Sequence, residues 1–117
     1  MHGRKRKLTK ALMADPPGDI DVLLMEGTTL ERASTGRMSL SEADIESRFT
    51  EVFAVGSGLT LVHTSAQNID RMVTIFRACR KARKTLVIDL YTAAVLEATG
   101  NPNIPQSNWP EIALYIP

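Results

Sequence analysis

The chain has 117 residues, of which 44% are hydrophobic and 23% charged, a composition typical of a soluble globular domain. This length provides one domain with a hydrophobic core and leaves too few residues for two domains of ordinary size. The net charge of +1 means that bulk electrostatics do not argue for a polyanionic partner, and the single cysteine excludes an intramolecular disulfide and a thiolate metal cluster.

The sequence carries no membrane or secretion signal. No apolar run approaches the roughly 18 residues that a membrane span requires. Residues 1–7 are basic, but no hydrophobic signal-type segment follows them. We therefore expect a cytoplasmic protein without a membrane partner.

The first predicted elements are a short helix and a strand. Leu8 and Leu12 have helical spacing and precede the breaker Pro16-Pro17-Gly18. Residues 22–25 form a compact apolar run, which is typical of a strand buried on both faces. The polar residues 26–29 follow at the carboxyl end of that strand.

A second helix is predicted to begin at Ser39. Ser39 and Glu42 have the spacing of a capping box, in which each side chain satisfies a free backbone N–H of the other residue. The apolar face of this helix continues to about Val55, and Gly56-Ser57-Gly58 ends it.

Strands and helices then alternate to the end of the chain. This alternation predicts an α/β fold with a three-layer, mostly parallel, Rossmann-like sheet flanked by helices. The predicted elements are a strand at 59–63, a helix at 69–79, a strand at 85–88, a helix at 91–98 and a last strand at 112–116.

Polar residues follow three of the predicted strands, at residues 26–29, 63–68 and 89–92. Ligands of parallel α/β sheets bind at the carboxyl ends of the strands, so these segments are candidate binding residues. Polar residues also end buried strands where nothing binds, and this structural explanation stays open.

Two groups of basic residues are present: five of the 14 basic residues lie in the first ten positions, and five more in residues 77–84. Such groups contact phosphates in nucleic-acid-binding proteins, but they are more often solvated surfaces. The second group occupies the end of a predicted helix, where cations offset the helix dipole. Its members are Arg77, Arg80, Lys81, Arg83 and Lys84.

The start of the helix at 69–79 is the better candidate for an anion site. Ser65, Gln67 and Asn68 precede it, where free N–H groups and the helix dipole favour an anion. Either Ser65 or Asn68 is also needed as the N-cap. Arg71 lies one turn further on and is expected to contact a phosphate or to pair with Asp70.

Two other reactive side chains have ordinary structural explanations. His63 lies at a strand end, where local hydrogen bonds are more common than a contact to a phosphate or base. Cys79 lies on the apolar face of its helix and is expected in the core.

The order and spacing of several motifs resemble metallo-β-lactamase-fold nucleases of the β-CASP type, and the likeness covers nearly the whole chain. These proteins carry a strand that ends in an acidic residue, a small residue and Ser or Thr, followed by a linker and a capped helix. The matching segments are Leu23-Leu24-Met25-Glu26-Gly27-Thr28-Thr29, Ser39-x-x-Glu42, residues 62–71, residues 87–93 and residues 112–117.

The resemblance implies an internal fragment of such a ribonuclease. Residues 1–29 would belong to the metallo-β-lactamase core, and residues 30–117 to a truncated β-CASP-like domain. RNA or DNA lies between these two parts in the family. Glu26 matches the acidic catalytic motif of the insert, and the expected nucleic-acid contacts are Thr28, Thr29, Ser65, Gln67, Asn68 and Arg71.

The metal site of the family is missing from this sequence. The family binds zinc through a His-x-His-x-Asp-His signature and further ligands, whereas this chain has two histidines, His2 and His63. A hydrolytic zinc site takes at least three protein ligands. We therefore expect the chain alone to bind no zinc and to be catalytically incompetent, although the complete family member is a zinc enzyme.

Two alternatives remain open. One is a Rossmann-like nucleotide-binding module, although Gly56-x-Gly58 precedes a predicted strand instead of following one. The other is a ligand-free remnant that self-associates. The strand at 22–25 lacks the neighbours that would normally flank it, and exposed strand edges promote association, so we expect a homo-oligomer.

Overall fold

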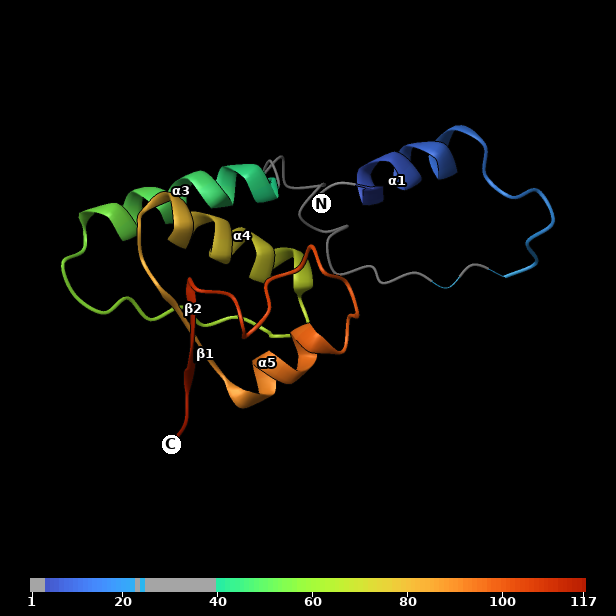
Figure 1. The fold of residues 1–117 in the computed structure, drawn as a ribbon. Coiled ribbons are helices and arrows are strands. Elements are labelled where there is room, and N and C mark those ends of the chain that lie inside the picture. Colours follow the sequence, from blue (N-terminus) through green and yellow to red (C-terminus); the bar gives the residue numbers. More distant parts are fainter. Residues whose placement is uncertain (1–3, 23, 25–39) are drawn as a thin grey trace. The chain divides into compact units, whose positions relative to one another are not determined.

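The computed structural model describes residues 4–22, 24 and 40–117 (Figure 1). The chain divides into two compact units, Met1–Ser41 and Glu42–Pro117. The described residues form an α/β protein with four helices and a two-stranded parallel sheet. None of these helices is both long enough and apolar enough to span a membrane. The predicted domain boundary between residues 29 and 30 lies outside the described residues.

The first unit contains helix α1, Arg4–Ala14, which confirms the helix predicted around Leu8 and Leu12. Both of these side chains are exposed. Val22 and Leu24, the described members of the predicted strand at 22–25, are exposed and lie in no strand.

Two helices of the second unit pack side by side (Figure 1): α3, Glu42–Val55, and α4, Ile69–Lys81. The apolar residues of α4 recur at helical spacing and form the centre of the core. Burial of Cys79 confirms its predicted place there and raises the pKa of its thiol. The buried apolar side chains of the two helices are Phe53, Met72, Ile75, Phe76, Ala78 and Cys79.

The sheet consists of β1, Leu86–Asp89, and β2, Ile112–Tyr115, joined through helix α5, Leu90–Glu97. The strands are parallel, with Leu86 beside Ile112 and Asp89 beside Tyr115. These elements confirm the last two predicted strands and the helix between them. Ile88, Leu96 and Ile112 are buried and belong to the same core cluster as α4.

The predicted strand at 59–63 is not formed. The backbone of residues 58–64 makes no hydrogen bond within the described part of the chain. Leu59 and Leu61 of this run are 84% and 86% exposed, while Val62 packs partly against the core. A strand requires a hydrogen-bonded partner, and this segment has none in the part of the chain that the structure describes. The described sheet therefore has two strands, and the described residues do not confirm the predicted three-layer arrangement.

Candidate functional site

Two of the three predicted polar segments meet at one edge of the second unit. The side-chain amide nitrogen Nε2 of Gln67 lies 3.2 Å from the hydroxyl oxygen of Tyr91, to which it donates a hydrogen bond. Residues 65–68 before α4 and residues 89–92 after β1 are thereby adjacent, and we call them the strand-end edge. Glu26, Thr28 and Thr29 of the third segment lie outside the described residues.

The start of α4 is built from local hydrogen bonds. Asn68 Oδ1 accepts from the backbone N–H of Arg71 at 3.1 Å and serves as the N-cap. Ser65 Oγ accepts from the N–H of Gln67 at 3.3 Å, and its carbonyl accepts from the N–H of Asn68 at 3.1 Å. Of the two predicted cap residues, Asn68 therefore fills the role, while Ser65 shapes the preceding turn. The side chains of Ser65, Gln67 and Asn68 remain exposed.

Arg71 forms an ion pair that the sequence did not indicate. Its Nε and Nη2 donate to the two carboxylate oxygens of Glu42 at 3.2 and 3.0 Å. The hydroxyl of the buried Thr74 donates to Glu42 Oε2 at 2.6 Å. The hydrogen bond from Arg71 is the main reason that the pKa of Glu42 is lowered, and the bond from Thr74 adds to it. The Arg71–Glu42 pair attaches the start of α4 to the start of α3.

Asp89 begins α5 on the other side of the strand-end edge. Its Oδ1 accepts from the backbone N–H of Thr92 at 2.7 Å. The hydroxyl and the backbone N–H of Thr92 stabilise the ionised carboxylate, so the pKa of Asp89 is lowered. A carboxylate has about four acceptor positions, and the contacts with Thr92 leave some of them open to solvent.

Most of the basic group at residues 77–84 is used within the second unit. Lys81 Nζ lies 2.7 Å from Glu46 Oε1, and Arg77 Nη1 lies 3.9 Å from Glu46 Oε2. Arg80 Nε lies 3.4 Å from Glu111 Oε1. These ion pairs give Arg77, Arg80 and Lys81 an intramolecular partner. The sequence had indicated a phosphate contact, a solvated surface or compensation of the helix dipole, but no such pairs.

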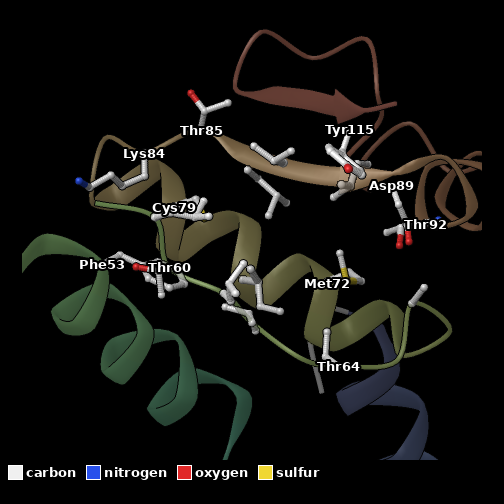
Figure 2. A pocket seen from close by; sticks show the side chains of 18 of the residues that line it. Phe53, Thr60, Thr64, Met72, Cys79, Lys84, Thr85, Asp89, Thr92 and Tyr115 are labelled. Carbon is white, nitrogen blue, oxygen red and sulfur yellow. Dashed lines mark hydrogen bonds between the residues drawn. The ribbon is translucent and has the colours of Figure 1, made fainter. Parts of the chain in front are cut away.

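A cavity of about 630 Å³ lies between residues 58–66 and β1 (Figure 2). We call it the strand-edge cavity. Met72 and Ile75 of α4 form part of its apolar wall. Lys84 lines one end and Asp89 the other, and Figure 2 shows these two residues at opposite ends of β1. This cavity could not be predicted from the sequence, because the apolar run at 59–63 predicted a strand in place of the irregular segment that lines the cavity.

The His63 side chain is exposed and makes no hydrogen bond to any residue that the structure describes. It is also the only histidine among the described residues, since His2 lies outside them. No group of three or more potential ligands gathers in the described part of the chain. A catalytic zinc site takes at least three protein ligands, so the described residues do not fit one.

Comparisons of the chain with protein-family models, with curated proteins and with solved structures gave no match. The candidate site is therefore defined by its geometry.

Proposed function

We propose that this chain is the part of a β-CASP metallo-β-lactamase-fold ribonuclease that positions the nucleic acid. The observation that carries the proposal is the strand-end edge, where the start of α4 and the end of β1 come together through Gln67 and Tyr91. Carboxyl-end edges of parallel strands are the usual ligand sites of α/β proteins. The ligand class, a nucleic acid, is proposed because the order of motifs along the chain resembles that of β-CASP nucleases.

The chemistry of the edge suits a phosphodiester backbone. The start of α4 presents the positive end of the helix dipole, which favours a negatively charged ligand. Ser65 and Gln67 add exposed hydroxyl and amide donors beside it. The bonds to Glu42 use Nε and Nη2 of Arg71, so its Nη1 remains to face a phosphate.

Three residues outside the described part of the chain are included in the proposal because of the resemblance alone. Thr28 and Thr29 would contact the same strand of RNA or DNA, and Glu26 would supply the acidic motif near the metals. In the complete family member, zinc supplies the hydrolytic chemistry and is held by ligands other than the described residues.

The proposal is tested by fluorescence anisotropy with a labelled single-stranded oligo-uridine RNA at low salt. Asn68→Asp keeps an N-cap oxygen but places a negative charge at the start of α4. We expect this change to weaken binding roughly tenfold, which is about 1.4 kcal/mol. Asn108→Asp is the matched control, because it adds the same charge at an exposed residue in the loop before β2.

Equal losses in the two variants would indicate general electrostatics and would contradict a site at the strand-end edge. Absence of any binding by the folded wild-type chain would contradict the nucleic-acid function as a whole.

Self-association is a second candidate property, favoured by exposed apolar residues beside the sheet. Leu61 is 86% exposed, and Val87 and Tyr115 are also exposed. Parallel sheets are normally covered on both faces, so these side chains suit contact with a second copy. Multi-angle light scattering should then give a mass above that of the monomer. Leu61→Ser should lower this mass, whereas Val55→Ser, an exposed change on α3, should leave it unchanged.

A further inference from the structure

We propose that the strand-edge cavity binds a short peptide in extended conformation, antiparallel to β1, with its C-terminal carboxylate at Lys84 and its N-terminal ammonium at Asp89. This inference does not depend on the nucleic-acid function, although Asp89 and Thr92 belong both to the strand-end edge and to the lining of the cavity.

Both walls of the cavity carry backbone groups that have no hydrogen-bond partner among the described residues. In the β1–β2 ladder, the N–H of Leu86 donates to the carbonyl of Glu111 at 3.0 Å. Successive residues of a strand direct their peptide groups to opposite sides, so Leu86 and Ile88 face β2. Val87 therefore directs its N–H and carbonyl towards the cavity, on the edge of β1 that pairs with no other strand of the described residues.

The wall opposite β1 also carries backbone groups without a partner among the described residues. Residues 58–64 run along the cavity and form no backbone hydrogen bond with any described residue. Backbone donors and acceptors strongly favour pairing, and a strand between these two walls can pair with both. A polypeptide carries alternating N–H and carbonyl groups on each edge, whereas a phosphodiester backbone has no such donors.

The size of the cavity indicates the length of the peptide. β1 has four residues, which span roughly 13 Å at about 3.3 Å per residue. The cavity volume of about 630 Å³ lies within the range of roughly 300–1,000 Å³ found for pockets that hold drug-sized ligands. A tetrapeptide matches both the length of β1 and this range.

The charges at the two ends indicate its direction. Lys84 is partly buried, and the partner of its ammonium among the described residues is the neutral carbonyl of Gly56 at 2.7 Å. Its neighbours Arg80 and Lys81 are each paired with a carboxylate. The positive charge of Lys84 is thus uncompensated locally, and a carboxylate would neutralise it.

Asp89 lies at the other end of β1 with an ionised carboxylate whose contacts within the second unit are with Thr92. It can accept from an ammonium group. A free peptide whose C-terminus lies at Lys84 and whose N-terminus lies at Asp89 runs antiparallel to β1. Met72 and Ile75 then face one side of the peptide, which favours apolar side chains at alternate positions.

Isothermal titration calorimetry on the full chain tests this proposal with a tetrapeptide of alternating threonine and valine whose ends are both free. We expect saturable binding to the wild-type chain. Amidation of the C-terminus and acetylation of the N-terminus should each weaken it, by roughly tenfold, because each removes one charge-assisted contact. Absence of binding to the folded chain, or equal affinity for the free and blocked peptides, would overturn the proposal.

Substitutions of Lys84 and Asp89 test which end of the peptide lies at each of these residues. In Lys84→Met, the affinities for the free and amidated peptides should become equal, and Lys84→Arg should restore the difference. In Asp89→Asn, which keeps a capping oxygen for α5, the free and acetylated peptides should bind equally. Arg83→Met is the control, because this neighbouring cation is exposed and does not line the cavity. A difference between free and amidated peptides that persists in Lys84→Met would contradict the assignment.

Discussion

At the scale of single residues, the guanidinium of Arg71 and the hydroxyl of Thr74 both donate to the carboxylate of Glu42 and join α4 to the start of α3. The N-cap role of Asn68 followed from its position just before a predicted helix, and the structure confirms it. The partner of Arg71 did not follow, because Glu42 lies 29 residues away and the sequence offered the adjacent Asp70. Only the packing of α3 on α4 brings the two side chains together.

The same pair gives the second unit a pH-dependent stability. The pKa of Glu42 is lower in the folded chain than its ordinary value of 4.5, and the main cause is the hydrogen bond from Arg71. The contribution of the pair is therefore complete above about pH 4.5 and is lost as the pH falls through the folded-state pKa. We expect Glu42→Gln to lower the free energy of unfolding at pH 7 by about 1–2 kcal/mol and to flatten its decline in acid.

Urea unfolding followed by circular dichroism at several pH values provides the measurement. Glu97→Gln is the matched control, since Glu97 is exposed and its side chain has no partner among the described residues. A wild-type acid profile in Glu42→Gln would show that the pair does not contribute to stability.

At the scale of elements, local patterns predicted helices better than strands. The helical spacing of Met72, Phe76 and Cys79 sufficed for α4, because every backbone bond of a helix lies within the helix. A strand depends on a partner elsewhere in the chain. The run at 85–88 is a strand because β2 pairs with it, whereas the similar run at 59–63 has no backbone partner among the described residues. The sequence also could not reveal the strand-edge cavity, which exists because that pairing is absent.

The cap of α4 should have a measurable effect on this element. Asn68→Ala removes the acceptor for the N–H of Arg71, and we expect it to lower the free energy of unfolding by about 1 kcal/mol. Asn68→Asp should cost much less, because its carboxylate also caps and is favoured by the helix dipole. Thermal unfolding of both variants provides the comparison, with Asn108→Ala as an exposed control. Similar losses for the alanine and aspartate variants would contradict the capping role and would also weaken the use of Asn68→Asp as an RNA-binding probe.

At the scale of the whole molecule, the distribution of buried side chains separates the two units. Every member of the described hydrophobic core, from Phe53 to Ile112, belongs to Glu42–Pro117. The apolar residues of α1, including Leu8 and Leu12, are exposed and contribute none of this burial. Composition and length predicted one domain with a core, and they could not indicate which part of the chain would form it.

We therefore expect a chain of residues 42–117 to unfold cooperatively on its own. Its Tm should lie within about 4 °C of that of the full chain, which corresponds to less than ~1 kcal/mol for a domain of this size. Differential scanning calorimetry measures both values, and the Glu42→Gln change introduced into both chains should lower the two Tm values equally. A shortened chain that lacks a cooperative transition would show that residues 1–41 supply part of the stabilising burial. The ratio of calorimetric to van't Hoff enthalpy shows whether the chain of residues 42–117 unfolds cooperatively, because a two-state unit gives a ratio near one.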